Sequence, residues 1–318
     1  METTQLANLT VYTKELGYVR YGDAKVGLLS HGLNYGTGCF EGIRGFWNAE
    51  ERELYLLHLA PHYRRFSQSA KILTIDLGMS VEEMAQATVE ICERNHFESD
   101  VYVRPLAFKA GEDVGVRLHG VPDAFAIVAI PFNRYIDSEG GLNVCTSSWR
   151  RIDDCSIPAR AKITGGYVNS AFAKSEAQQN GFDEALMLSH DGHVSEGSAE
   201  NFFMVKNGVL VTPDESQNIL EGVTRDSIIG IARDTLGLQV RERSIDRTEV
   251  YTAQEAFLTG SAAGIAPIVS LDRRAIGDGT IGPITAQLME MYDRAVRGRE
   301  PRYRAWLTPT YADRKVSA

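Results

Sequence analysis

The chain has 318 residues, of which 43% are hydrophobic, and it carries a net charge of -9 with a pI near 5.4. This length suffices for one or two hydrophobic cores, and the acidic balance argues against nucleic acid or an anionic membrane as a partner. The sequence has no apolar run of about 18 residues and no signal-peptide pattern at its start. Its four cysteines lack a Cys-x-x-Cys pair, so we expect free thiols and a cytoplasmic location.

Short strands and helices alternate in the first part of the chain. Pro61 suits the first turn of a helix that reaches about Ile72, and Ser80 with Glu83 forms a capping box for the next helix. The run 124–130 is apolar throughout, which predicts a strand buried on both faces. We expect the strands at residues 9–20 (a hairpin), 40–46, 54–57, 101–109 and 124–130, with a loop over 30–38.

Two of these strands carry candidate binding residues. With a period of two, Phe40, Gly42 and Arg44 share one face of their strand, so a cation stands in an otherwise apolar wall. By the same rule Tyr102 and Arg104 share a face and can aim at one anion. For Arg44, an exposed edge-strand arginine is the alternative interpretation.

Two further positions in this part are ambiguous. Pro105 predicts that its strand is at an edge or contains a bulge. Arg65 lies off the apolar stripe of its helix, so its side chain is either solvated or directed into a site beside the helix.

The segment 133–141 is the most linker-like part of the sequence. We therefore expect a small α/β domain over residues 1–132 and a second domain over 142–318. In the second domain, Asp191-Gly192 and Asn207-Gly208 are hairpin signals that delimit strands at 184–189, 194–205 and 209–212. Further elements are expected at 222–236 (helix), 256–259 (strand) and 281–296 (helix).

Lys162 lies between a turn and the sequence Gly-Gly-Tyr, and a helix capped by Asn169 or Ser170 is expected to follow. A lysine used as an amine nucleophile must be held in position, and small neighbours let the backbone approach a flat ligand. Taken alone, the segment equally fits a surface lysine beside a glycine turn.

Glu196 is flanked by small residues, so a bulky group could pack beside its carboxylate. His190, His193 and Glu196 also invite a metal-site hypothesis, as in a metal-dependent hydrolase. That match is poor, because the two histidines straddle a predicted hairpin turn rather than share a helical face.

Two turns have the features of anion sites. Gly222-Val223-Thr224 opens a helix and offers free N–H groups, a hydroxyl and the positive end of the helix dipole, which suits a phosphate. The turn from Gly260 to Gly264 offers further backbone donors. A reactive lysine, a carboxylate and anion-binding turns together are what a pyridoxal phosphate enzyme requires.

The chain resembles the fold-type IV pyridoxal phosphate enzymes, most of all the branched-chain amino acid aminotransferases. The resemblance spans nearly the whole chain. Its motifs are Tyr35-Gly-Thr-Gly-Cys-Phe-Glu-Gly-Ile-Arg44, His62-x-x-Arg65, Tyr102-Val-Arg-Pro105, Ala161-Lys-x-x-Gly-Gly-Tyr167, Ser195-Glu-Gly-x-x-Glu-Asn201, Gly222-Val-Thr-Arg-Asp226 and Gly260-Ser-Ala-Ala263.

The resemblance implies a small α/β domain, a larger pseudo-barrel domain and pyridoxal 5'-phosphate as cofactor. Lys162 would carry the Schiff base and move the proton at the substrate α-carbon. The implied cofactor ligands are Tyr167 on the ring hydroxyl, Glu196 on the ring nitrogen, and Arg65, Val223, Thr224 and Ser261 on the phosphate. The implied substrate contacts are Tyr35, Phe40, Gly42, Arg44, Tyr102, Arg104 and Ala262. In this family the loop carrying Tyr35 enters the neighbour's site, so a homodimer or a higher homo-oligomer is implied.

The expected reaction is transamination of L-leucine, L-isoleucine and L-valine with 2-oxoglutarate. D-amino acid and (R)-amine transaminases and aminodeoxychorismate lyase remain alternatives within the fold. The loop from Gly115 to Gly120 departs from the branched-chain pattern, because it carries Arg117 and His119 where many such enzymes have Asn-Pro. Arg117 is then either a determinant of selectivity or a solvated loop residue.

Overall fold

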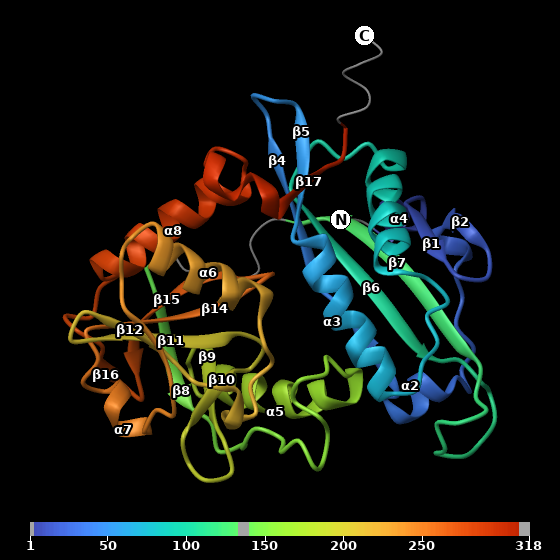
Figure 1. The fold of residues 1–318 in the computed structure, drawn as a ribbon. Helices are drawn as coiled ribbons and strands as arrows, with labels where there is room; N and C mark the ends of the chain where they lie inside the picture. The colour runs from blue at the N-terminus through green and yellow to red at the C-terminus, as the bar shows by residue number, and fades with distance from the viewer. Residues whose placement is uncertain (1–2, 133–139, 312–318) are drawn as a thin grey trace. The chain divides into compact units, whose positions relative to one another are not determined.

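The computed structural model describes residues 3–132 and 140–311 (Figure 1). Two compact units are formed: Met1–Asn133 with Ala161–Gly165 and Arg294–Ala318, and Arg134–Arg160 with Gly166–Asp293. Most of the predicted linker, residues 133–139, lies outside the described residues. The division into 1–132 and 142–318 therefore stays a prediction, whereas Lys162 groups with the first unit rather than the second. No helix in the described ranges is long and apolar enough to cross a bilayer.

The first unit is built on an antiparallel sheet with the order β17-β5-β4-β6-β7-β1-β2, in which β3 also pairs with β6. The helices α3 and α4 contact this sheet and each other, and they bury Tyr63, Phe66, Met84 and Ile91. The strands are β1 (Thr10–Thr13), β2 (Gly17–Arg20), β3 (Gly38–Phe40), β4 (Ile43–Asn48), β5 (Glu53–Leu57), β6 (Val101–Lys109), β7 (Asp123–Pro131) and β17 (Leu307–Pro309). The helices are α1 (Thr3–Ala7), η1 (Tyr21–Asp23), α2 (His31–Tyr35), α3 (Leu59–Ile72), α4 (Val81–Arg94) and η4 (Pro301–Trp306).

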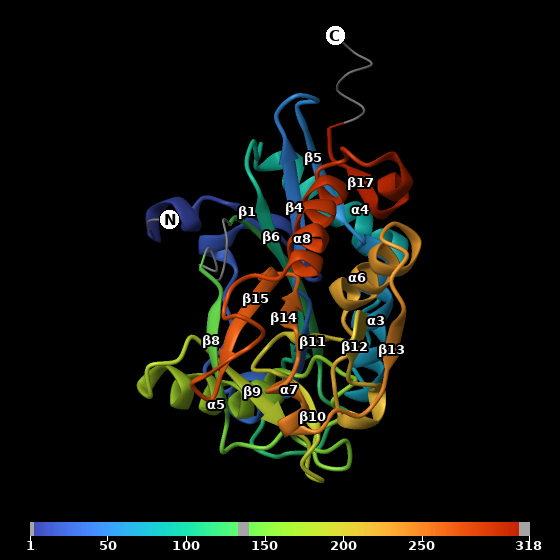
Figure 2. The same cartoon turned by 90° about the vertical axis from the view of Figure 1, so that its left-hand side faces the viewer.

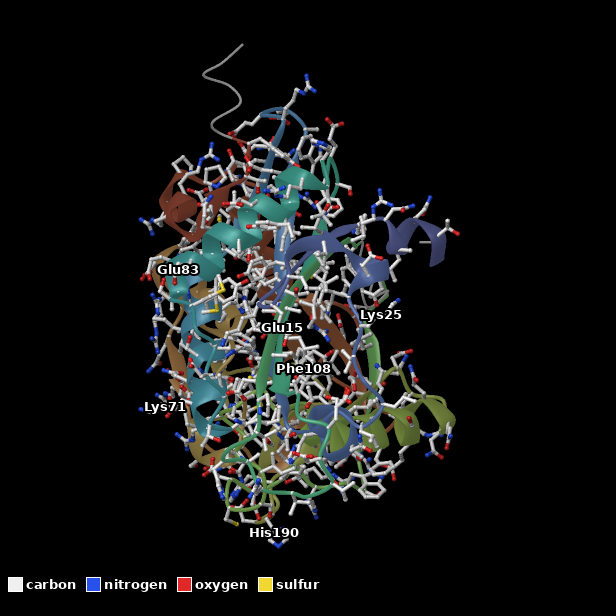
Figure 3. The ribbon with its side chains drawn as sticks, turned by 90° about the vertical axis from the view of Figure 1, so that its right-hand side faces the viewer. Glu15, Lys25, Lys71, Glu83, Phe108 and His190 are labelled. Atoms are coloured by element: carbon white, nitrogen blue, oxygen red, sulfur yellow. The ribbon has the colours of Figure 1, made fainter. Side chains whose placement is uncertain are left out.

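Several predictions for this unit are confirmed: the hairpin, β6, α3, and α4 with its capping box between Ser80 and Glu83. Figure 3 shows Lys71 and Glu83 on the outer side of α3 and α4, where both side chains are exposed. Three predictions are wrong. The loop over 30–38 contains α2, the strand over 40–46 is broken after Phe40, and β7 is buried on alternate residues rather than on both faces.

The break after Phe40 also explains Pro105, which is not at an edge because β6 pairs on both sides. Its carbonyl accepts a hydrogen bond from the Glu41 N–H at 2.9 Å, at the gap between β3 and β4. Proline has no N–H to donate, so it fits where the neighbouring ladder is interrupted.

The second unit is built on a sheet with the order β10-β9-β8-β15-β14-β11-β12-β13, and β10 also pairs with β11. That extra pairing closes six strands into a ring, which confirms the predicted pseudo-barrel (Figure 2). The strands are β8 (Leu142–Thr146), β9 (Glu184–Leu188), β10 (Val194–Gly197), β11 (Asn201–Lys206), β12 (Val209–Thr212), β13 (Val240–Glu242), β14 (Glu255–Gly260), β15 (Gly264–Leu271) and β16 (Arg274–Ala275). The helices are η2 (Thr164–Gly166), α5 (Tyr167–Gln179), η3 (Glu215–Gln217), α6 (Val223–Asp234), α7 (Arg247–Val250) and α8 (Pro283–Val296), and two of them, η2 and α8, run across a unit boundary.

The two hairpin turns are confirmed, and Gly192, Asn207 and Gly208 have the positive φ values that such turns require. The predicted single strand over 194–205 is wrong, because a turn at 198–200 folds it into the antiparallel pair β10 and β11. The predicted helix start is also wrong: α5 begins at Tyr167, with Gly166 rather than Asn169 or Ser170 at the cap.

Candidate active site

The backbone of Lys162 is fixed within the first unit by two neighbours. Its carbonyl accepts a hydrogen bond from the Phe40 N–H at 3.1 Å, and its own N–H donates to the Ser69 hydroxyl of α3 at 3.1 Å. The Lys162 ammonium nitrogen lies 5.1 Å from the centre of the Phe40 ring. The Lys162 backbone is thus tied to both β3 and α3 within the first unit.

Glycines allow this segment to approach β3 closely. The Gly165 N–H donates to the Gly36 carbonyl at 3.1 Å, and a Cβ added to Gly36 would lie 2.8 Å from the Gly165 Cα. Gly36 also has a φ of 68°, a conformation that favours glycine. The small residues around Lys162 therefore have a packing role in this structure.

Arg65 is neither solvated nor isolated. Its Nε and Nη2 donate to the two carboxylate oxygens of Glu41 at 2.7 and 2.8 Å, and its side chain is only 11% exposed. His62, one turn earlier on α3, contacts the same carboxylate through Nδ1 at 2.8 Å. The Glu41 side chain is fully buried in the strand break.

The electrostatics of this cluster follow from burial and from the arginine. Burial would raise the pKa of the Glu41 carboxyl, but Arg65 and His62 hold that pKa well below its ordinary value. Burial lowers the pKa of His62, so the imidazole is neutral near pH 7 and its Nδ1–H donates to the carboxylate. Arg65 is then the cation that balances Glu41. Sequence reasoning assigned no role to Glu41, although an acid beside Phe40 in a predicted strand was a usable signal.

The structure brings Phe40, Gly42, Tyr102 and Arg104 together, whereas the predicted common strand face of Phe40, Gly42 and Arg44 is lost at the break after Phe40. The Arg104 guanidinium lies 4.4 Å from the centre of the Phe40 ring and donates to the Tyr102 hydroxyl at 2.9 Å. A Cβ added to Gly42 would lie 2.2 Å from that hydroxyl oxygen, so any side chain at 42 would displace Tyr102.

Arg44 faces a different environment from Arg104. Its side chain is 6% exposed, its guanidinium lies 3.6 Å from the Asp100 carboxylate, and it contacts the rings of Phe46 and Phe132 at 5.0 Å each. Arg297 also donates to Asp100, at 3.1 Å. The Arg44 charge is therefore compensated inside the unit.

The loop residues are more exposed. The Tyr35 hydroxyl accepts a hydrogen bond from the Gly115 N–H at 3.3 Å, and its side chain is 39% exposed. Arg117 and His119, on the same loop as Gly115, are both exposed.

In the second unit Glu196 is the centre of a hydrogen-bond network. One carboxylate oxygen lies 2.9 Å from Nη2 of Arg151, and the other accepts from Nδ2 of Asn201 at 3.0 Å and from the Leu220 N–H at 3.1 Å. Only 4% of Glu196 is exposed. Arg151 and Asn201 were not among the predicted site residues; Asn201 was quoted in a motif, and Arg151 followed another arginine with no periodic signal.

This network continues into the predicted phosphate turn. The Asn201 amide also donates to the Leu220 carbonyl at 2.8 Å, and a Cβ added to Gly222 would lie 2.0 Å from the Asn201 Oδ1. Gly222 caps α6 without a side-chain hydrogen bond, so this helix begins as a backbone anion site would. Thr224 is buried in the first turn of α6.

The other predicted ligands of this unit also have defined positions. Tyr167 is the first residue of α5, Val223 is the first of α6, and Ser261 and Ala262 stand in the turn between β14 and β15. All four are partly buried.

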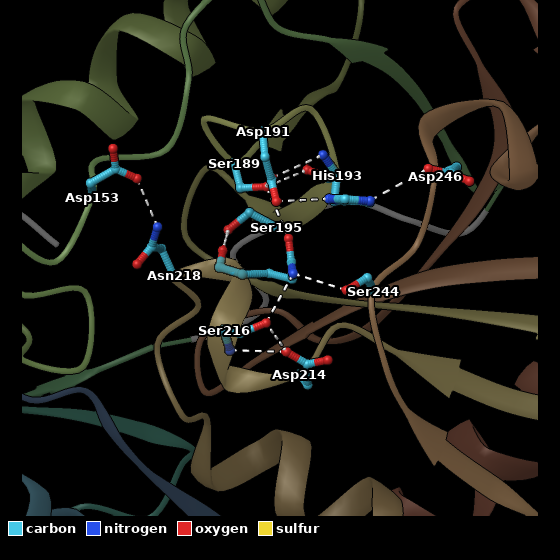
Figure 4. A network of polar contacts seen from close by, with 11 residues as sticks. Asp153, Ser189, Asp191, His193, Ser195, Asp214, Ser216, Asn218, Ser244 and Asp246 are labelled. Carbon is cyan, nitrogen blue, oxygen red and sulfur yellow. Dashed lines mark hydrogen bonds and ion pairs between the residues drawn. The ribbon is translucent and has the colours of Figure 1, made fainter.

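Figure 4 shows a second polar network, which holds the segment that leads to the predicted phosphate turn at Gly222. The Ser189 hydroxyl donates to Gln217 at 2.9 Å, the Ser195 hydroxyl donates to the Gln217 carbonyl at 2.6 Å, and the Gln217 amide donates to Ser244 at 3.1 Å. Because Gln217 is 4% exposed, this network fixes the approach to Leu220 and Gly222.

The histidines of the metal hypothesis belong to this region but not to Glu196. His193 contacts Asp191 at 3.0 Å and Asp246 at 3.6 Å (Figure 4), and the His190 side chain is 82% exposed (Figure 3). Across the described ranges no cluster of three or more His, Cys, Asp or Glu side chains could hold a metal ion. The metal-hydrolase alternative therefore has no support from this geometry.

Comparison with known proteins identifies the family of the chain. Residues 38–271 match the family described as amino-transferase class IV, which is well over half of the chain. The chain therefore belongs to the class IV aminotransferases. Within them it is similar to a protein of Aquifex aeolicus (strain VF5) named "Probable branched-chain-amino-acid aminotransferase", with 46% identity over 91% of this chain and 93% of that one. The branched-chain-amino-acid aminotransferase of Escherichia coli (strain K12) is 36% identical over 96% of this chain and 98% of its own length.

Solved structures give the same result for the fold. The branched-chain aminotransferase of Thermoproteus uzoniensis, solved with norvaline, matches with a TM-score of 0.91 and 44% identity over 95% of this chain and 99% of that chain. The enzyme of Thermobaculum terrenum in its PLP form matches with a TM-score of 0.91 and 40% identity over 96% of this chain and 99% of that chain. The predicted fold class is thereby confirmed.

Proposed function

We propose that the chain is a pyridoxal 5'-phosphate-dependent branched-chain amino acid aminotransferase. It transfers the amino group of L-leucine, L-isoleucine or L-valine to 2-oxoglutarate and so forms branched 2-oxo acids and L-glutamate. The observation that carries this proposal is the position of Lys162, whose backbone is hydrogen-bonded to both β3 and α3. The identity with enzymes of that name supports the substrate class.

The residues present fit this cofactor. The α6 N-terminus offers backbone donors for a phosphate, and Gly222 leaves space that a Cβ would take from Asn201. Glu196 offers a buried carboxylate for the ring nitrogen, and Arg65 offers a guanidinium for the phosphate. The remaining assigned ligands are Tyr167 for the ring hydroxyl and Val223, Thr224 and Ser261 for the phosphate.

When bound, the cofactor supplies an electron sink for the bond that breaks at the substrate α-carbon. The protein supplies the proton transfer: the Lys162 amine moves the proton between the α-carbon of the substrate and the cofactor. The Glu196 carboxylate would accept a hydrogen bond from the protonated ring nitrogen, and the hydroxyl of Tyr167 would orient the ring through a hydrogen bond.

The substrate contacts come from the cluster around Phe40. Phe40 and Gly42 present apolar surface and space for a branched chain, and Tyr102 with the backbone of Ala262 receives the α-carboxylate. Arg104, exposed beside Phe40, is the cation best suited to the second carboxylate of 2-oxoglutarate or glutamate. Arg44, assigned to the same pocket from its strand position, is already paired with Asp100.

We also propose a homodimer. Large hydrophobic side chains are exposed together on the segments 26–35 and 114–116, an arrangement typical of a protein–protein interface: Val26, Leu28, Leu29, Leu33, Tyr35, Val114 and Val116. Burial of these residues by a second copy would carry Tyr35 toward the neighbour's substrate.

A cytoplasmic location is supported by the four cysteines, none of which forms a disulfide.

A panel of amino donors with 2-oxoglutarate as acceptor tests this function. We expect L-leucine, L-isoleucine and L-valine to be the best donors, and Lys162→Ala to abolish turnover while the protein stays folded. Near-normal turnover by Lys162→Ala would refute the lysine assignment. A preference for D-amino acids or (R)-amines would instead support the alternative reactions and give Arg117 a role in selectivity.

A further inference from the structure

Arg151 is held in place on three sides within the second unit. Its N–H donates to the Leu188 carbonyl at 2.9 Å, its Nε donates to the Asn218 carbonyl at 3.2 Å, and its Nη2 lies 2.9 Å from a carboxylate oxygen of Glu196. The Arg151 side chain is 14% exposed and that of Glu196 is 6% exposed. The ion pair is therefore largely removed from water, so solvent screens it weakly.

The other oxygen of Glu196 accepts hydrogen bonds from two neutral groups. These are the Asn201 amide and the Leu220 N–H, at 3.0 and 3.1 Å. The nearby acid is Glu200, in the turn that follows β10. Burial, with Glu184 and Glu196 nearby, raises the pKa of Glu200, which favours the neutral form of this group. Among these neighbours Arg151 is the charged group that acts most directly on Glu196.

We propose that Arg151 is a positioning residue that keeps the proton between Glu196 and the cofactor ring nitrogen on the nitrogen. This rests on the proposed role of Glu196. A proton shared by a carboxylate and a pyridine nitrogen resides on the group with the higher proton affinity. A guanidinium beside a carboxylate lowers the carboxylate's proton affinity, commonly by about ten- to a thousandfold. Arg151 therefore favours the protonated ring, which is the form that accepts electrons.

Loss of orientation acts in the same direction as loss of charge. Without Arg151, one Glu196 oxygen loses its fixed partner, and the buried carboxylate loses the cation that stabilises its ionised form. Both changes shift the shared proton toward Glu196. Removal of Arg151 is therefore expected to lower the protonation of the ring nitrogen. The effect is expected at the ring nitrogen rather than at the phosphate turn.

The test is the ¹⁵N chemical shift of the ring nitrogen in holoenzyme loaded with ring-¹⁵N-labelled pyridoxal 5'-phosphate. We expect a protonated nitrogen at neutral pH in the wild type and in Arg151→Lys, and a largely unprotonated nitrogen in Arg151→Gln. The turnover number of Arg151→Gln should fall about tenfold or more. Arg151→Met is a second neutral variant in case Arg151→Gln does not load the cofactor.

Arg150→Gln is the matched control, because Arg150 is the adjacent arginine and its side chain is exposed. It should leave the ring-nitrogen signal at the wild-type position. A protonated nitrogen in both neutral variants would overturn the proposal, and so would a deprotonated nitrogen in Arg151→Lys. Glu196→Gln tests the role of Glu196 separately from the role of Arg151. If this variant leaves the nitrogen protonated, Glu196 is not the ring partner and the underlying assignment fails.

Discussion

Glu41 and Arg65 form a two-point ion pair in which both carboxylate oxygens are bonded, at 2.7 and 2.8 Å, and the carboxylate is fully buried. The pair joins the break between β3 and β4 to the middle of α3. The same helix face carries Ser69, whose hydroxyl accepts from the Lys162 N–H. One helix face thus holds both the proposed phosphate arginine and the backbone of the proposed nucleophile.

We predict that Glu41→Ala lowers the free energy of unfolding by about 3–5 kcal/mol, because it leaves the Arg65 charge largely buried without its partner. Denaturant unfolding monitored by circular dichroism measures this change. Glu98→Ala is the control, since Glu98 makes an exposed ion pair with Arg52 that should contribute less than about 1 kcal/mol. Equal effects of the two substitutions would contradict the importance of the buried pair.

The same pair predicts how stability depends on pH. Because the folded-state pKa of Glu41 lies below its ordinary value of 4.5, its contribution is present above that value and is lost as pH falls toward the folded-state pKa. Wild-type stability should therefore decline below about pH 4.5 more steeply than that of Glu41→Gln. Denaturant midpoints of both proteins across the acid range measure the difference. Parallel curves would show that Glu41 is not a main acid-sensitive group.

The sequence predicted the proposed catalytic and cofactor-binding residues better than it predicted the residues that hold them in position. Lys162, Glu196 and the turn at Gly222 stood out because a nucleophile, an acid and a helix start each have local signals. Glu41 and Arg151 did not, since their roles depend on partners 24 and 45 positions away in the sequence, brought near only by folding.

The errors in secondary structure have a similar cause. Residues 40–46 and 194–205 have strand-like composition, and each is interrupted at a buried acid: at Glu41 in the first segment and at Glu200, in the turn over 198–200, in the second. Periodicity reports which residues favour a strand. It does not report where a tertiary contact breaks one.

We predict that Arg65→Ala weakens the binding of pyridoxal 5'-phosphate by about ten- to a hundredfold. Charge-assisted hydrogen bonds to a phosphate contribute roughly 1.5–3 kcal/mol each. Titration of apoenzyme with pyridoxal 5'-phosphate measures the dissociation constant, and titration with pyridoxal, which lacks the phosphate, is the control. If both ligands lose affinity equally, Arg65 acts through the structure around Glu41 rather than on the phosphate.

The last prediction separates the two arginines proposed for the substrate. Arg104 is exposed and stacks on Phe40, whereas Arg44 is buried and paired with Asp100. Arg104→Ala should therefore raise the Michaelis constant for 2-oxoglutarate or glutamate by about tenfold or more and change that for leucine little, because only the former lose a charged partner.

Arg44→Ala should instead lower stability and affect leucine and glutamate alike, since its removal takes a cation from Asp100. Steady-state kinetics with both donors, together with denaturant unfolding, measures the two variants side by side. Arg117→Ala serves as the comparison for the exposed loop. A selective loss of glutamate activity in Arg44→Ala, with Arg104→Ala unaffected, would return the second carboxylate to Arg44. A selective loss in Arg117→Ala alone would assign it to the loop.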